Sequence, residues 1–585
     1  MAQIHRADIP TETMYIPTTA DEVRHLGWEG LDVILVTGDS YIDSPYIGAA
    51  VIGKVLINAG YRVGIIAQPD VSTGEDILRL GEPALFWGVS AGSLDSMVAN
   101  RTASGKKRKH DDYTPGGLNN RRPDRASIIY SNVIRQYFRN TCPIVLGGIE
   151  ASLRRVAHFD FWTDKIRRSI LFDAKADYLI YGMAERPVLE FAGALKSGSD
   201  PRLIKGLCYI AKSVPPDAVE LPSYQESAAD KDVFTRMFHI FYGNNDPLTA
   251  ARMVQKQDTR YLVHNPPAQV LSTQELDSVH ALDFERNAHP FYGGQGEIKA
   301  LETIRDSITS HRGCYGECNF CSITVHQGRT VSWRSEGSIV REAELIAGLP
   351  GFKGTIHDVG GATANMYGIE CSKKIREGSC SDRRCLVPEI CDRMEVNHSR
   401  QISLLRALRG IKNVKRVIVA SGIRYDLVLA DKKYGLEYLR EILKFHISGQ
   451  MKIAPEHMDN RILKIMGKPG VEALSKFRDI FYRLAGSFSK EQHLSYYLIA
   501  AHPGCTERDM EKVKSFSREK LGINPRQVQI FTPTPSTYSS LMYWTEKDPF
   551  TGESLFVEKS FKGRENQKNA VTGGKSGIRK CPPAR

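Results

Sequence analysis

Six short apolar runs alternate with helical stretches in the second half of the chain, and this alternation limits the possible folds more than any other feature. The runs cover residues 304–309, 355–359, 416–420, 451–454, 496–501 and 527–531. Between them, stretches such as SIVREAELIAGL and GLEYLREILKF have the spacing of amphipathic helices. Six strand–helix units over about 230 residues approach the roughly 250 residues of a complete eight-unit barrel. We therefore predict a partial (βα)6 TIM-type barrel over residues 295–545.

The first half of the chain has a second α/β pattern. The apolar run LDVILVTGD is followed by a helix-like stretch at residues 47–59 and by the strand-like run YRVGIIAQPD. Residues 84–89, 143–147 and 178–181 are further strand candidates, each followed by glycine or small residues. This pattern predicts a doubly wound α/β domain and a connector within residues 1–294. Ligand sites in such a domain lie at the carboxyl ends of the strands.

The net charge of +12 comes from two segments. Residues 101–125 carry eight Lys or Arg against three Asp, and residues 559–585 carry eight against one Glu, so that they contribute +5 and +7. We expect residues 101–125 to form an exposed basic loop and residues 546–585 a basic, disordered tail, because both are poor in apolar residues. No uncharged apolar run approaches the roughly 20 residues that cross a bilayer, and the start of the chain does not resemble a signal peptide. We expect a cytoplasmic protein with no membrane partner.

The strongest chemical signal is the segment HRGCYGECNFC, directly after the first predicted barrel strand. It contains the triad Cys314, Cys318 and Cys321, spaced Cys-x3-Cys-x2-Cys. A cubane iron–sulfur cluster normally takes four thiolates, so three would leave one iron open to an exogenous ligand. The alternative is a structural zinc site completed by His311 or His326. The position at the top of a barrel strand, where barrel enzymes place catalytic groups, favours the cluster.

The triad, with Phe320 before its last cysteine, resembles the motif of the radical S-adenosylmethionine (radical SAM) superfamily. SITSHRGCYGECNFC, MKIAPEHM and VQIFTPTPSTYSSLMYWT extend the likeness to the uncharacterised YgiQ-type radical SAM proteins. The resemblance implies an enzyme with a [4Fe–4S] cluster on the triad. Its open iron would bind S-adenosylmethionine, which is cleaved to a 5′-deoxyadenosyl radical that acts on an unknown substrate. An electron donor is then required.

The same resemblance implies further cofactor contacts at the ends of the barrel strands, whereas catalytic residues stay unassigned. The implied contacts are Phe320 against adenine, Gly360 and Gly361 against the methionyl amine, and the strand-end residues Arg424, Asp426, Glu456, His502 and Gly504. The glutamate that usually follows the glycine pair is replaced here by Ala-Thr. Cys505 lies close to His502 in sequence, and we consider a nucleophilic pair there as a minor alternative.

A second cysteine group follows the glycine pair, in an insertion at residues 362–400. It consists of Cys371, Cys380, Cys385 and Cys391. Four thiols can close a zinc or iron–sulfur site, with His398 as a substitute ligand. The remaining interpretation is a set of reduced loop thiols.

The N-terminal domain, with PIVLGGIEAS and YLIYGMAE, resembles the cobalamin-binding domains that precede some radical barrels. The segment GDSYIDSPYIG lacks the axial histidine that those domains commonly present. The sequence therefore argues against cobalamin and favours a domain for a substrate or partner. Two alternatives to a radical SAM enzyme of unknown reaction remain. One is a radical modifier of RNA that uses the basic segments as phosphate contacts, and the other is a non-catalytic metal-binding regulator.

Overall fold

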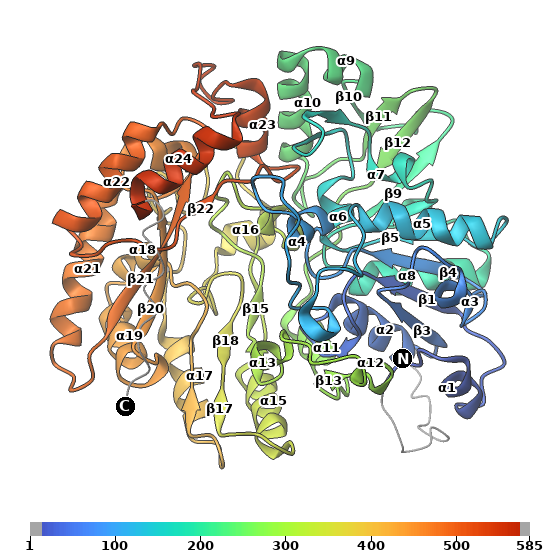
Figure 1. Ribbon diagram of the computed structural model, residues 1–585, viewed down its shortest axis with the longest axis horizontal. Coiled ribbons are helices and arrows are strands. Elements are labelled where there is room, and N and C mark those ends of the chain that lie inside the picture. Colours follow the sequence, from blue (N-terminus) through green and yellow to red (C-terminus); the bar gives the residue numbers. More distant parts are fainter. Residues whose placement is uncertain (1–14, 574–585) are drawn as a thin grey trace.

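The computed structural model describes residues 15–573, which form two α/β domains (Figure 1). The N-terminal domain is built on a nine-stranded sheet whose first five strands are parallel, in the order β3 (Val63–Ala67), β1 (Val33–Thr37), β4 (Phe86–Ser90), β5 (Ile144–Leu146) and β8 (Tyr178–Ile180). It continues with β9 (Leu207–Ala211), β12 (Arg260–His264), β11 (Met253–Gln257) and β10 (Val219–Leu221). The strand order reverses between β1 and β4, as in doubly wound sheets, which confirms the predicted class.

Helices cover both faces of this parallel sheet, and the strands are therefore apolar throughout rather than alternating. All five residues of β1 are buried. Helices α2 (Gly48–Asn58) and α8 (Glu185–Ser197) pack side by side on one face, whereas α3 (Glu75–Leu78) and α5 (Ala126–Tyr137) pack on the other.

The second domain is an open barrel of parallel strands. Its strands are β14 (Ser307–Thr309), β17 (Thr355–Ile356) with β18 (Asp358–Gly360), β19 (Arg416–Val417), β20 (Gln450–Glu456), β21 (His493–Ala500) and β22 (Gln529–Ile530). Helices α15 (Glu336–Gly348), α17 (Ser399–Arg409), α19 (Gly435–Glu441), α21 (Val471–Ala485) and α22 (Glu507–Glu519) lie around the strands (Figure 1). A parallel bridge between Ile423 and Ile453 joins the β19 region to β20. The predicted partial barrel is confirmed.

The two domains pack against each other beside β14. Helix α14 (Ile323–Gln327) contacts α6 (Gly148–Leu153), and α23 (Tyr538–Thr545) contacts α10 (Lys231–Gly243). Two buried ion pairs also join the domains, Arg312 with Glu185 and Arg286 of the connector with Glu342 of α15. None of the helices within residues 15–573 has the length and apolar character needed to cross a membrane.

The prediction of an exposed basic loop at residues 101–125 is only partly confirmed. Residues 106–110 are exposed, but the Arg122 side chain has no exposed surface. Arg122 forms ion pairs with Asp39 at 2.6 Å and with Asp111 at 3.2 Å. Asp39 follows β1, so the loop is folded onto the carboxyl end of the parallel sheet.

The prediction of a disordered tail is wrong for residues 546–573. Helix α24 (Phe561–Thr572) packs beside α22 (Figure 1). Its buried face consists of Arg564, Gln567 and Val571, one residue per turn. Because two of these residues are polar, a criterion based on apolar periodicity does not detect the helix. Residues 574–585 of the predicted tail lie outside the described residues.

Candidate functional site

The triad lies on the loop between β15 (His311–Arg312) and α14, immediately after the first barrel strand. The loop begins at Gly313, which has φ +83°. A Cβ atom there would lie 2.3 Å from the carbonyl oxygen of Thr330. Glycine meets both requirements, the left-handed backbone and the close approach of the two segments.

Gly316 packs between the thiols of the triad. A Cβ atom at Gly316 would lie 3.3 Å from Cys314 Sγ and 3.7 Å from Cys318 Sγ, so both sulfurs lie within 4 Å of one point. The Gly316 N–H donates a hydrogen bond to Cys314 Sγ (3.3 Å), and Thr363 Oγ1 lies 3.6 Å from the same sulfur. Burial, followed by the charges of the Cys318 and Cys314 thiols, raises the pKa of Cys321 to about 12. The third thiol is therefore close enough to the other two for their charges to act on it.

The donor set of the triad fits an iron–sulfur cluster better than a single metal ion. Within residues 15–573, no three His, Cys, Asp or Glu side chains converge on a point where one ion could bind them. Zinc needs such convergence, whereas each thiolate of a cubane binds a different iron. The two histidines considered for zinc are engaged elsewhere: His311 Nε2 lies 2.9 Å from the Thr363 carbonyl oxygen, and His326 Nδ1 lies 3.0 Å from Ser152 Oγ.

Arg424 brings a positive charge to the triad. Its Nη1 lies 3.9 Å from Cys318 Sγ. Its Nη2 binds Asp426 at 2.5 Å, and its backbone N–H and carbonyl oxygen both hydrogen-bond the Asn365 amide. Burial and the Cys318 thiol raise the pKa of Cys314, whereas the Arg424 guanidinium lowers it. Arg424 therefore favours the thiolate, which is the form that binds iron.

The glycine pair Gly360–Gly361 at the end of β18 packs against β15, which leads into the triad loop. A Cβ atom at Gly361 would lie 2.5 Å from the carbonyl oxygen of His311 and 2.8 Å from its Nε2. Burial lowers the pKa of His311 to about 4, so the ring is neutral. The absence of a side chain at Gly361 thus lets the second barrel strand approach the base of the triad loop.

Phe320 and Glu456 lie at the same end of the barrel. The Phe320 ring packs edge-on against the His502 ring, with 6.3 Å between the centroids. His502 Nε2 bonds to Ser539 Oγ at 2.7 Å. Glu456 ends β20 with φ +70°, a strained conformation for a residue with a side chain, and burial raises the pKa of its carboxyl group.

The second cysteine group packs against the triad loop. Cys371, Cys385 and Cys391 share one apolar cluster with Cys314 and Tyr315. Lys373, Lys374 and Arg383 donate hydrogen bonds to Cys380, Cys385 and Cys391, at 3.1, 3.6 and 3.8 Å respectively. Cationic side chains therefore face three of the four thiols. His398, considered as a substitute ligand, instead bonds Asp431 through Nδ1 (2.9 Å) and Asn365 through Nε2 (3.2 Å).

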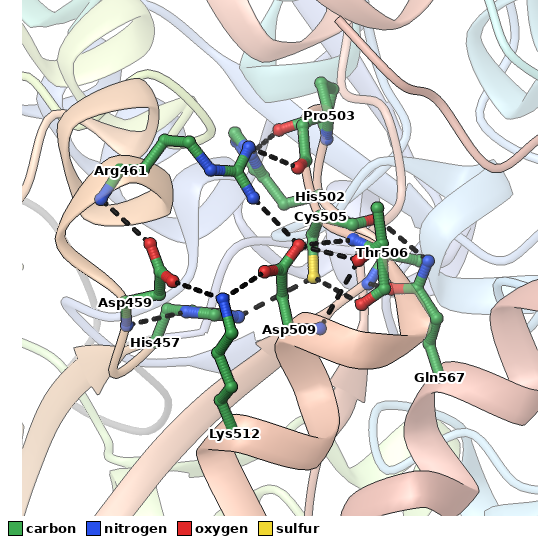
Figure 2. Close-up of polar contacts among 12 residues, drawn as sticks. His457, Asp459, Arg461, His502, Pro503, Cys505, Thr506, Asp509, Lys512 and Gln567 are labelled. Atoms are coloured by element: carbon green, nitrogen blue, oxygen red, sulfur yellow. Dashed lines mark hydrogen bonds and ion pairs between the residues drawn. The ribbon is translucent and has the colours of Figure 1, made fainter.

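The hypothesis of a nucleophilic pair formed by Cys505 and His502 is wrong. Cys505 Sγ lies 3.6 Å from His457 Nε2 instead (Figure 2). His457 Nδ1 accepts a hydrogen bond from the Asp459 N–H, so the ring proton is on Nε2 and points to the sulfur. Burial raises the pKa of Cys505 to about 12 and lowers that of His457 to about 4. Both groups are neutral near pH 7, and the thiol is not activated.

A cavity of about 520 Å³ lies where the carboxyl ends of the two sets of parallel strands meet. Its lining includes Thr37, Ser90, Gly147 and Gly182 from the N-terminal domain, and Thr309 and Gly360 from the barrel. His311, Arg312 and His326, which flank the triad, also reach it, and Arg312 pairs with Glu185 of the other domain. The sequence analysis considered His311 and His326 only as zinc ligands, and it missed Arg312 and Glu185. The position of Glu185 in YLIYGMAE, just after a strand and a glycine, is the signal that could have pointed to one of them.

Comparisons with known proteins agree with this architecture. A family model described as the radical SAM N-terminal domain matches residues 15–307. A UPF0313 protein of Fusobacterium nucleatum is 55% identical over 559 residues, which cover 95% of this chain and 98% of the relative. A UPF0313 protein of Thermotoga maritima is 47% identical over 570 residues, which cover 97% and 100%. The radical SAM methyltransferase TsrM of Kitasatospora setae, solved with cobalamin and a [4Fe–4S] cluster, aligns with a TM-score of 0.51 and 14% identity over 87% of this chain and 77% of TsrM.

The structural comparison contradicts the argument against cobalamin. The two domains together have the fold of an enzyme that was solved with this cofactor, so the lack of an axial histidine in GDSYIDSPYIG was not a sufficient reason to set cobalamin aside. The relatives match almost from end to end at about half identity, and the family model covers the N-terminal half. The chain belongs to the UPF0313 family of radical SAM enzymes.

Proposed function

We propose that this enzyme binds a [4Fe–4S] cluster through Cys314, Cys318 and Cys321, and S-adenosylmethionine at the iron that these thiolates leave open. The observation that carries the proposal is the arrangement of the thiols around Gly316, beside the charge of Arg424, at the carboxyl end of the first barrel strand. When bound, these groups supply one-electron cleavage of a sulfonium and a carbon radical that abstracts a hydrogen atom from substrate. The proposal includes an external electron donor in the cytoplasm.

The surrounding residues would bind and orient the cofactor. Gly360 and Gly361 line the cavity at the end of β18, so their backbone would be available to the methionyl amine. Phe320 packs edge-on against His502, which leaves ring surface for adenine. Glu456 is buried with a raised pKa, and its carboxyl group can donate a hydrogen bond in the protonated form.

The substrate would enter the 520 Å³ cavity between the domains. This volume is within the roughly 300–1,000 Å³ that is usual for small-molecule sites. Arg312 and Glu185 provide one positive and one negative charge at the domain junction. The glycines at the strand ends would allow the ligand to approach the backbone closely.

Anaerobic reconstitution with iron and sulfide tests the proposal. The wild-type chain should bind iron and form 5′-deoxyadenosine from S-adenosylmethionine after reduction. The triple Cys→Ala variant of the triad should lose the iron of one [4Fe–4S] cluster and all cofactor cleavage, whereas Cys142→Ala, a half-buried thiol of the N-terminal domain, should keep both. Cofactor cleavage by the triad variant, with an iron content equal to that of the wild type, would refute the assignment.

Cobalamin in the same cavity is the second candidate, favoured by the cavity's position at the switch point of the doubly wound sheet and by the fold shared with TsrM. Titration with hydroxocobalamin should change its visible spectrum upon binding. Ala49→Trp, which fills the cavity from the start of α2, should abolish the change, and Ala59→Trp at the exposed end of that helix should not. Equal spectra for both variants would exclude this site.

A further inference from the structure

The basic loop and the tail helix α24 meet in space, although they are far apart in sequence. Arg564 Nη1 donates a hydrogen bond to the Ala103 carbonyl oxygen (3.2 Å), and a Cβ atom at Gly105 would lie 3.6 Å from the Phe561 ring. A cavity of about 490 Å³ lies between these segments and residues 161–164. It shares no lining residue with the cavity between the domains.

This second cavity has an excess of positive charge. Its charged lining residues are Arg101, Arg125, Lys559 and Arg564, against Asp124 and Asp164. Arg101 binds Asp124 at 2.6 Å, Arg125 binds Asp160 at 2.8 Å, and Lys559 Nζ lies 3.6 Å from a Glu546 carboxylate oxygen, which leaves Arg564. Within residues 15–573, no carboxylate lies within ion-pair distance of the Arg564 guanidinium, which is buried and donates to carbonyl oxygens instead. An anion in the cavity would therefore meet a guanidinium that forms no ion pair with the described residues, and the only carboxylates among them whose charge acts on it, those of Glu558 and Glu565, lie beyond ion-pair distance.

Burial acts on the same cations. It lowers the pKa of Lys559, and it lowers that of Arg564. A lowered pKa means that the charged form is poorly compensated, and a bound anion would supply the compensation. The lowered pKa values of Lys559 and Arg564 agree with the position of both side chains in the lining of the cavity.

Aromatic side chains alternate with these cations around the cavity. Phe161, Trp162, Tyr543 and Phe561 line it. The Arg564 guanidinium lies 4.6 Å from the Phe561 ring centroid and 5.0 Å from that of Phe161, and Lys559 Nζ lies 4.1 Å from that of Tyr543. Phe561 is 53% exposed, so one face of its ring is accessible. Phe561 belongs to the second basic segment, and the fold places Phe161, Trp162 and Tyr543 beside it.

We propose that this cavity binds a nucleotide, either free or as a unit of single-stranded RNA, with its base stacked on Phe561 or Trp162 and its phosphate bound by Arg101, Lys559 and Arg564. Cations beside aromatic platforms are the combination with which proteins bind single-stranded nucleic acid and nucleotides. The site goes beyond the proposed function, and its occupancy does not require the cluster.

Equilibrium binding to the full chain tests the site, with a short fluorescein-labelled single-stranded RNA and with adenosine monophosphate as competitor. Phe561→Ala should weaken binding roughly tenfold, as expected for the loss of one stacking contact. Phe556→Ala is the matched control, because Phe556 is 50% exposed and does not line the cavity. Lys559→Gln should weaken binding more than Lys562→Gln, which removes the same charge from a residue that does not line the cavity.

Competition by the mononucleotide would assign the site to free nucleotides, and RNA binding without such competition would assign it to a strand; both results support the proposal. Absence of binding by either ligand would overturn it, and so would equal losses in Phe561→Ala and Phe556→Ala. The triad variant should bind as the wild type does, which separates this test from that of the radical chemistry.

Discussion

Replacing Gly316 by alanine tests the packing of the triad most directly. The new Cβ atom would lie 2.7 Å from Arg424 Nη1 and 3.3 Å from Cys314 Sγ. Ordinary contacts between such atoms are about 3.5 Å or longer, so the guanidinium would have to move by roughly 0.8 Å. It has little freedom, because Arg424 is buried and its Nε and Nη2 both bind Asp426.

The expected cost follows from these contacts. Overpacking of this kind costs about 1–3 kcal/mol, and the reduced entropy of the unfolded chain offsets roughly 0.5–1 kcal/mol of it. We therefore expect Gly316→Ala to lower the free energy of unfolding by about 1–2 kcal/mol and to reduce the iron content after reconstitution. Gly348→Ala is the control, since a Cβ atom there would meet no atom within 4 Å.

Urea unfolding of the iron-free protein and iron analysis of the reconstituted protein measure the two effects. The Arg424→Gln/Asp426→Asn background removes both members of the ion pair, so no buried charge is left unpaired. In that background Gly316→Ala should cost at least about 0.5 kcal/mol less, as a double-mutant cycle would show. Equal costs in both backgrounds, or a cost no larger than that of Gly348→Ala, would refute the packing argument.

Gln567→Ala should destabilise the fold by about 1–3 kcal/mol relative to Asn566→Ala in urea unfolding, because the Ala501 N–H and the Cys505 carbonyl oxygen lose a buried partner. Iodoacetamide should not modify Cys505 in the folded protein at about pH 8, since its pKa is about 12; rapid alkylation, measured against Cys505→Ala, would contradict this. Elemental analysis of the triad variant should still find iron, because the cations beside the second cysteine group favour thiolates; metal-free folded protein would refute this site. Circular dichroism should show acid destabilisation below about pH 6.5. Four buried histidines have a folded pKa of about 4, below the unfolded value, so their contribution is complete above about 6.5 and is lost as the pH falls toward about 4. A transition independent of pH in this range would contradict their neutral burial. These residues are His158, His311, His326 and His457.

Both parallel sheets could be predicted from the sequence because of their burial. Strands covered on both faces are apolar throughout, and they alternate with amphipathic helices, so each unit is recognisable by itself. The positions of the strand ends follow from the same pattern, whereas Arg424 was identified through the resemblance to the radical SAM superfamily. Contacts between polar residues that are distant in sequence leave no such periodicity. Two features are therefore visible only in the fold. One is the buried pairing of Arg122 with Asp39 and Asp111, and the other is the hydrogen bond by which Gln567 attaches α24 to the barrel.

The packing of the two domains could not be predicted from the sequence, because it also depends on contacts between residues that are distant in sequence. This packing determines where a ligand would lie. Parallel α/β folds of both kinds place ligands at the carboxyl ends of their strands, and here those ends face one cavity. The ion pairs of Arg312 with Glu185 and of Arg286 with Glu342 are buried at this junction. Separation of the domains would also undo the packing of α14 against α6 and of α23 against α10. A ligand in the cavity therefore lies beside the triad loop without any movement of the domains.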